Sequence, residues 1–502
     1  MTAGQLGPLV HLRWRMVRRR PARVGMVVAA GASLGLIVAA AVVPPLLPNR
    51  HAGGILVLLP TIYAGFALLA FAAPIAAGGG NELYPADQLV AFPVTARTHY
   101  LSGLLLAPLN LAWFTQCGVL MAATGFGLHT PHPRLALALG IVTVYIALVT
   151  LLGQAVAWFL VGVRQTATGR RAVWAVAACL VGIVAVIIGA HLTLTVLNHL
   201  PTFWVASGAI AAYGGRTVRW LVPLSVMLAL CWASLRVGVA ACAWALRRTG
   251  DAGVAKEGRP LPRRAAPTSS AAALAAVDRA SVWRSQALRR GAYVLALLPA
   301  AVAAFAHLQW SSLVLLPGLV AAGAGLLFGV NAFCLDAGGA VWVSSLPVAP
   351  RLVFAAKARV LAEVVLATVV VALVAGISRT STAPDLTAVV GVVGGAAACS
   401  TWVVAACMDW SVRKPHRADL RGSRDTPAPP GAMAVYSARL AIATTFIGLI
   451  VATLVTVGQP VAVAAWSLAV VAVALRRLLR ARRRYCDDPM TRARVVATVA
   501  AG

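Results

Sequence analysis

The sequence NAFCLDAGGAVWVSSLPVAPRLVFAAK, residues 331–357, has a counterpart half a chain earlier, NELYPADQLVAFPVTARTHYLSG, residues 81–103. Both stretches follow a long apolar run and pass through a Gly-rich or acidic patch and a short amphipathic piece. A Pro-Val turn and a basic residue then lead into the next apolar run. The repeat predicts a protein of two related halves, each with a polar hairpin between two membrane helices.

The composition of the chain is that of a membrane protein. Hydrophobic residues make up 60% and charged residues 11% of its 502 residues, and about 20 apolar residues suffice for a helix to cross a bilayer. We therefore expect an all-α polytopic membrane protein. The net charge of +30 comes from basic residues at the ends of apolar runs, where anionic lipid and the positive-inside rule place them. This pattern favours membrane lipids as a partner over nucleic acid.

The apolar runs predict about twelve spans, six in each half, as a pseudo-two-fold duplication. A cytoplasmic interfacial helix over 1–23 precedes the first half, 24–246, with spans expected at 24–47, 54–77, 100–126, 134–162, 172–197 and 220–244. A flexible cytoplasmic linker, 247–280, is expected from its Pro- and Arg-rich composition. It leads to the second half, 281–477, with spans at 291–309, 311–333, 352–376, 386–408, 435–457 and 459–476. A basic cytoplasmic tail, 478–502, follows.

The distribution of arginine predicts that both termini lie in the cytoplasm. Basic clusters occupy the loops on the side of the N-terminus, whereas the opposite loops hold only scattered charges, as the positive-inside rule requires. The same orientation puts both hairpins on the cytoplasmic side. One external segment, 198–219, is semi-apolar. It is expected either to re-enter the membrane or to form a simple external loop.

Motifs for nucleotide hydrolysis and zinc-dependent proteolysis are absent from the sequence. There is no G-x-x-x-x-G-K-[ST] phosphate loop and no H-E-x-x-H, the patterns that hold phosphates and catalytic zinc. None of the eight cysteines forms a C-x-x-C pair, so neither a zinc site nor a disulfide framework is indicated. We expect no enzymatic activity and no metal or cofactor in this chain. Any dependence on ATP must come from a partner.

Glu363 and Arg236 lie inside apolar runs and form a possible intramembrane polar site. Glu363 lies in the helix after the second hairpin, and a carboxylate at membrane depth usually faces protein or water. It is either a proton or substrate contact or an ion-pair partner of Arg359, four residues earlier, or of Lys357. Arg236 either lines a cavity or extends toward the cytoplasm.

The two hairpins carry the candidate docking site. Alignment of Phe92-Pro93-Val94 with Leu346-Pro347-Val348 pairs Glu82 with Asp336 and Arg97 with Arg351. Ordinary turns, in which Pro simply begins the next helix, need not repeat this pattern in register. We expect a short amphipathic helix on the membrane surface in each half. The residues expected at the docking surfaces are Glu82, Asp87, Pro93 and Arg97 in the first hairpin and Asp336, Trp342, Pro347 and Arg351 in the second.

This order of an acidic residue, an amphipathic stretch, L-P-V-x-x-R and a long helix resembles the cytoplasmic coupling hairpin of ABC-2-type transporter permeases. Each half is similar to one such permease, so the chain resembles two permeases fused head to tail. The resemblance implies an exporter in a bacterial plasma membrane. It also implies two copies of a separate ATP-binding-cassette subunit, which bind ATP-Mg and dock on the hairpins. The first copy departs from the pattern with Phe92 in place of leucine, and the second half lacks the family's long external loop before its last span.

Two other functions remain open from the residues alone. A proton-coupled secondary transporter also commonly has six plus six spans, and Glu363 is its candidate coupling residue. A membrane-embedded lipid-linked transferase is the other alternative, although the expected external loops are short and carry few acids.

Overall fold

The computed structural model describes residues 31, 34, 35, 38, 39, 42, 43, 52–77, 94–106, 111–128, 134–166, 168, 169, 171–173, 175, 176, 179, 199–248, 267, 269–306, 308–380, 383–417 and 426–501. These residues form helices and turns, with no strand among them. They fall into two compact units, Met1–Leu261 and Pro262–Gly502. The boundary lies inside the segment expected as a linker.

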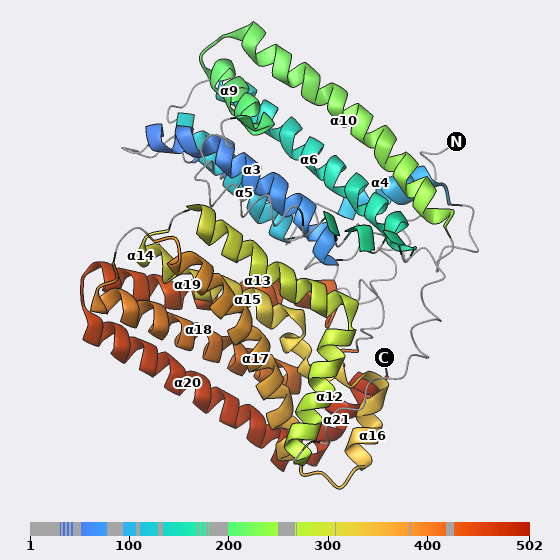
Figure 1. The fold of residues 1–502 in the computed structure, drawn as a ribbon, viewed down its shortest axis with the longest axis vertical. Helices are drawn as coiled ribbons and strands as arrows, with labels where there is room; N and C mark the ends of the chain where they lie inside the picture. Colours follow the sequence, from blue (N-terminus) through green and yellow to red (C-terminus); the bar gives the residue numbers. More distant parts are fainter. Residues whose placement is uncertain are drawn as a thin grey trace. The chain divides into compact units, whose positions relative to one another are not determined.

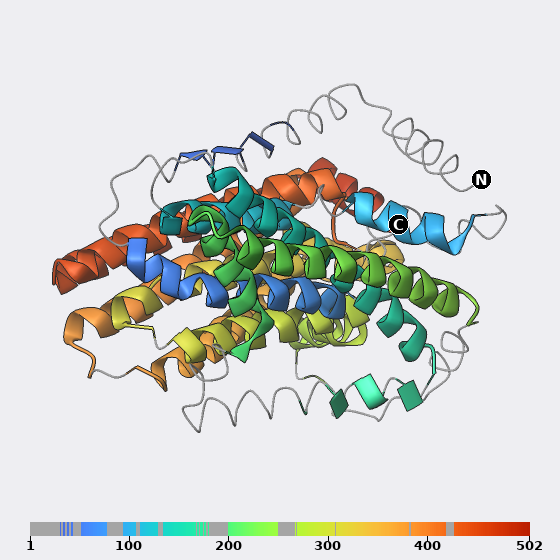
Figure 2. The ribbon, with the colours of Figure 1, turned by 90° about the horizontal axis from the view of Figure 1, so that it is seen from above.

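Unit 1 is a layered helix bundle. Its helices are α3 (Ala52–Ala77), α4 (Ala96–Leu106), α5 (Leu111–Leu128), α6 (Leu135–Arg164), α9 (Pro201–Tyr213) and α10 (Thr217–Leu246). Helices α6 and α10 run alongside each other in both views (Figure 1 and Figure 2). In the core, the Tyr145 hydroxyl donates a hydrogen bond to the Tyr63 carbonyl oxygen at 2.7 Å, which satisfies a polar group that would otherwise be buried alone.

Unit 2 holds the second hairpin. Its elements are α12 (Ser270–Arg284), α13 (Gln286–Ala306), α14 (Trp310–Leu313), α15 (Leu316–Leu327), η5 (Gly329–Leu335), η6 (Ala337–Gly339), α16 (Ala340–Ser345), α17 (Pro350–Ile377), α18 (Leu386–Arg413), α19 (Pro430–Thr456), α20 (Pro460–Asp487) and α21 (Pro489–Ala500). Helices α18 and α20 lie side by side. Helices α12, α16 and α21 gather at one end of the unit, at the lower right in Figure 1. We call this end the hairpin end.

Eight helices within the described residues are long and apolar enough to cross a membrane. Six of them match the six spans expected in the second half, and Leu135–Arg164 and Thr217–Leu246 match two of the first half. The chain is therefore a multi-pass α-helical membrane protein. The expected span 54–77 coincides with α3, and the expected span 100–126 is covered in part by α4 and in part by α5. The expected spans 24–47 and 172–197 and the interfacial helix over 1–23 lie largely or wholly outside the described residues.

Three expected segments differ from the structure. The external segment 198–219 contains α9, whose Val205 and Ala209 are buried against neighbouring helices, so it is not a simple loop. The linker expected to reach residue 280 ends by Ser269, which caps α12 by accepting a hydrogen bond from the Ala272 amide. The region expected as a tail continues α20 to Asp487 and then forms α21. Helices α12 and α21 bury valine or alanine on one face, a signal that the overall polarity of these segments hides.

Candidate functional site

The second hairpin, residues 328–349, is built from short helical pieces. Helix α15 ends at Leu327, and the chain turns because Asn331 has non-helical backbone angles, with φ −147° and ψ 62°. The six-residue helix α16 follows. Helix α17 then begins with Pro350 in its first turn, where proline leaves no hydrogen bond unmade. The sequence thus positions a surface helix directly before a membrane-length helix.

The outer surface of this hairpin exposes both apolar and polar side chains. Val341 is 56% exposed and Trp342 is 67% exposed. Ser344, Ser345, Pro347 and Arg351 are also exposed. Three of the four residues predicted for docking in this hairpin, Trp342, Pro347 and Arg351, are therefore exposed. Tryptophan and arginine are among the residue types that most often dominate binding energy in protein interfaces.

Asp336 does not lie on this surface, which corrects the expectation. Its side chain is 10% exposed and accepts a hydrogen bond from the Lys357 ammonium at 2.5 Å. The same ammonium binds Asp278 of α12 at 2.5 Å, and both of these side chains are almost fully buried. We call Asp278, Asp336 and Lys357 the buried triad. It joins three elements, because α12, the hairpin and α17 contribute one residue each.

The buried triad contains two carboxylates and one ammonium, so its formal charge is negative when all three groups are ionised. Burial raises the pKa of Asp278 above its ordinary value, against the opposing pull of the Lys357 ammonium, and the neighbouring Asp336 carboxylate adds to the rise. Burial disfavours the charged form of a carboxyl group. The Tyr485 ring lies close by, stacked on Phe333 with ring centroids 4.8 Å apart.

Glu363 forms a second, more exposed ion-pair group. Arg279 of α12 binds it with two hydrogen bonds of 2.6 and 2.7 Å, the bidentate geometry that arginine favours. Arg359 adds a contact of 3.0 Å, which confirms that expected pairing. The alternative pairing with Lys357 is wrong, because that ammonium is engaged in the buried triad. Two neighbouring residues of α12, Asp278 and Arg279, thus both bind α17.

The start of the hairpin is fixed by hydrogen bonds to neighbouring loops and to α18. The side-chain amide of Asn331 donates hydrogen bonds to the backbone carbonyl oxygens of His416 at 2.8 Å and Pro427 at 2.7 Å. Ser411 accepts from the Ala332 amide and donates to the Gly329 carbonyl, each at 2.8 Å. These contacts satisfy backbone groups that the interrupted helix leaves free. The start of the hairpin is therefore attached to α18 and to the chain that follows α18.

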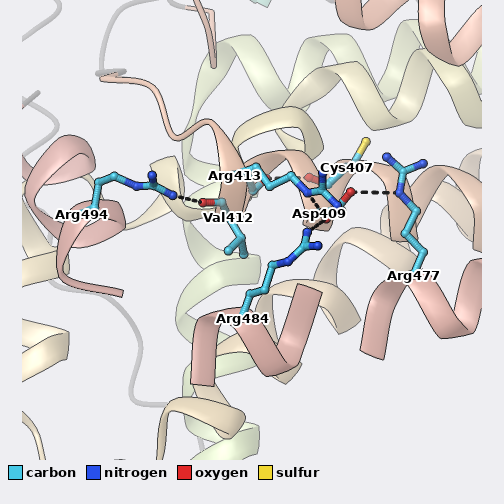
Figure 3. Close-up of polar contacts among 8 residues, drawn as sticks. Cys407, Asp409, Val412, Arg413, Arg477, Arg484 and Arg494 are labelled. Atoms are coloured by element: carbon cyan, nitrogen blue, oxygen red, sulfur yellow. Dashed lines mark hydrogen bonds and ion pairs between the residues drawn. The ribbon is translucent and has the colours of Figure 1, made fainter. Parts of the chain in front are cut away.

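Asp409 is the centre of a third charged group, near the same end. Its side chain is 3% exposed and binds Arg413 at 2.8 Å, Arg477 at 3.1 Å and Arg484 at 3.1 Å. Figure 3 shows the three guanidinium groups approaching this carboxylate from α18 and α20. We call these four residues the Asp409 cluster. Three arginines on one aspartate leave a surplus of positive charge.

The remaining expected site residues belong to unit 1. Glu82, Asp87 and Pro93 lie outside the described residues. Arg97 is exposed in the first turn of α4, whose start is capped by Thr95 accepting from the Thr98 amide at 3.2 Å. Arg236 is exposed on α10, with its guanidinium 5.0 Å from the centre of the Trp232 ring.

The sequence reading missed Asp278, Arg279 and Lys357 as site residues. Two signals could have pointed to them. The chain has only 13 acidic residues, so each acidic residue near a membrane helix is expected to form an ion pair with a basic residue. Lys357 is also a rare lysine in an arginine-rich chain, and a compact ammonium fits between two carboxylates better than a planar guanidinium does.

The described part of the chain contains no group of three or more His, Cys, Asp or Glu residues that could hold a metal ion. A match to G-x-S-x-G occurs at residues 31–35, but Gly31 and Gly35 are helical, unlike the strand-to-helix turn that this motif occupies in hydrolases. Comparison of the chain with protein-family models, with curated proteins and with solved structures found no match.

Proposed function

We propose that the chain is the permease of an ATP-binding-cassette exporter, with the second hairpin as a docking surface for a separate ATPase. The observation that carries the proposal is the exposed Trp342 on a short helix that is anchored directly to a membrane-length helix. Unpaired aromatic surface at the polar end of a membrane protein suits a soluble partner. The resemblance of the hairpin sequence to ABC-2-type permeases supports the same function.

In this proposal the buried triad transmits motion. A partner that pushes on α16 would displace Asp336, and the shared Lys357 ammonium would carry that displacement to α17 and to Asp278 of α12. A rigid, hydrogen-bonded anchor makes this coupling effective, because packed cores switch between discrete arrangements instead of deforming continuously. The ATPase supplies the energy, and this chain supplies the pathway.

The same proposal also specifies the topology of the chain, its location and its partner subunits. The chain would have about twelve spans, both termini in the cytoplasm and a place in a bacterial plasma membrane. Two ATPase copies, each binding ATP-Mg, would dock on the two hairpins. The chain itself would be neither an enzyme nor a holder of a cofactor.

The experiment is purification of the tagged protein from its native cells in mild detergent, followed by identification of co-purifying proteins. Recovery of an ATPase with a phosphate loop is expected. Trp342→Ala combined with Arg351→Glu should weaken that association by about 30-fold or more, the usual effect of losing an interface hot spot. Trp232→Ala removes a tryptophan of similar exposure, 62%, on α10 and should have no effect. Unchanged association in the double variant would refute the docking role of the hairpin.

One observation favours a second candidate, a proton-coupled secondary transporter. The buried triad places two carboxylates around one ammonium, and buried acidic groups are common in the proton relays of transporters. This function predicts uptake or efflux in sealed vesicles that follows a proton gradient without ATP and fails in Asp278→Asn. The permease function predicts transport that needs ATP and the co-purified ATPase.

A further inference from the structure

An apolar groove lies on the surface of unit 2 between α18, α19 and α20. Its volume is about 280 Å³, and it is lined by Trp402, Ala443, Phe446, Ile447, Trp466, Ala469, Val470 and Val473. The lining exposes no polar surface. All three helices are long and apolar enough to span a membrane, so the groove opens toward the hydrocarbon of the bilayer.

One end of the groove meets the Asp409 cluster. Arg477 is the link, because its guanidinium lies 5.7 Å from the centre of the Trp402 ring and also binds Asp409 at 3.1 Å. Beyond it, Arg413 and Arg484 have side chains that are 52% and 43% exposed. Three guanidinium groups share one carboxylate, so their positive charge is only partly compensated. Basic groups between membrane helices are the chemistry that holds anionic lipid headgroups.

The spacing along α20 matches the depth of one lipid leaflet. Arg477 is eleven residues beyond the groove residue Trp466, which is about 16 Å along a helix. Half of a hydrocarbon core of about 30 Å is about 15 Å. With Arg477 at headgroup level, Trp466 therefore lies near the bilayer centre, where an acyl chain ends.

We propose that this groove and the Asp409 cluster form a binding site for an anionic phospholipid. An acyl chain fills the groove along α20, and the phosphate binds the exposed sides of Arg413 and Arg484. A zwitterionic lipid would bring a cation toward the arginines and should bind more weakly. A partner helix or a second copy of the chain would fill the apolar groove but would leave the positive charge of the arginines uncompensated.

The test is binding of phosphatidylglycerol, compared with phosphatidylcholine, to the purified full-length protein. Native mass spectrometry counts bound lipids, and thermal unfolding during lipid titration gives the affinity. Ala469→Phe should block the groove, and Leu468→Phe is its control, because Leu468 is 69% exposed and lies outside the groove lining. Arg413→Gln and Arg484→Gln should each weaken phosphatidylglycerol binding by about fivefold. Arg482→Gln, on α20 about 140° around the helix from Arg477, is the charge control.

The proposal is supported if phosphatidylglycerol binds more tightly than phosphatidylcholine and if the groove and arginine variants lose this preference while both controls retain it. Equal binding of the two lipids would overturn it. Loss of binding to the same extent in Leu468→Phe and Arg482→Gln would also overturn it, as would a groove variant that binds like the wild type. Each variant is first checked for wild-type thermal unfolding in detergent without added lipid. If Ala469→Phe fails that check, Ala443→Phe is used in its place.

Discussion

Replacing Lys357 by methionine should detach α12 and the second hairpin from α17. The substitution keeps the length of the side chain but removes the only ammonium shared by Asp278 and Asp336. Both carboxylates would stay buried without this partner. Removing one partner of a buried ion pair costs about 3–5 kcal/mol, which raises the population of the detached state roughly 100- to several-thousand-fold.

Hydrogen exchange in mild detergent measures this effect directly. The amides of α12 and of the hairpin should exchange faster in Lys357→Met by that factor, whereas amides in the middle of α18 should be unaffected. Arg359→Gln, two residues away on the same helix, is the control. Its side chain is 63% exposed, so the loss of its ion pair should cost no more than about 1 kcal/mol.

A charge-free variant separates lost attraction from lost packing. Lys357→Met combined with Asp278→Asn and Asp336→Asn removes all three charges and should recover a large part of the protection, because apolar and neutral replacements of a buried ion group are often tolerated. The reasoning would be refuted if Lys357→Met altered the exchange of α12 no more than Arg359→Gln does.

Three further effects are expected. Ala337→Gly should stabilise unit 2 by about 0.5–1 kcal/mol in detergent unfolding, because Ala337 has φ 44°, a conformation that is strained for residues with a Cβ; destabilisation would contradict this. Asp409→Asn should lower the unfolding free energy by only about 1 kcal/mol, because the arginines that lose this counter-charge are partly exposed; an unchanged midpoint would count against the cluster as a structural element. The pKa of Asp278 is raised in the folded state, so the folded protein binds this proton more tightly than the unfolded chain does. Docking of α12 should therefore weaken as pH rises above about 4 toward that higher pKa. Hydrogen-exchange rates, corrected for their intrinsic pH dependence, should show this slope in the wild type and lose it in Asp278→Asn.

The sequence predicted the span positions in unit 2 because length and hydropathy are local properties. It also placed Trp342 on the hairpin surface, since proline and glycine mark the turns around α16. It failed for Asp336, whose partner Lys357 is 21 residues away on α17 and is shared with Asp278 of α12. Ion pairing across such separations depends on how helices pack, which hydropathy does not encode. Helices α12 and α21 were missed for a related reason, because a narrow apolar stripe on a basic segment shows its role only once its packing partner is known.

The buried triad also constrains the order in which unit 2 is assembled. Asp278 leaves the ribosome 79 residues before Lys357, an interval of about 4–16 s at ordinary rates of synthesis. During that time α12 cannot bury its aspartate favourably, so it should wait at the membrane surface while α13 and α15 insert. Once Lys357 has been made, its ammonium can bind both carboxylates and so join α12 and the hairpin to α17. A chain interrupted before residue 357 should therefore leave the hairpin and α12 unattached to each other.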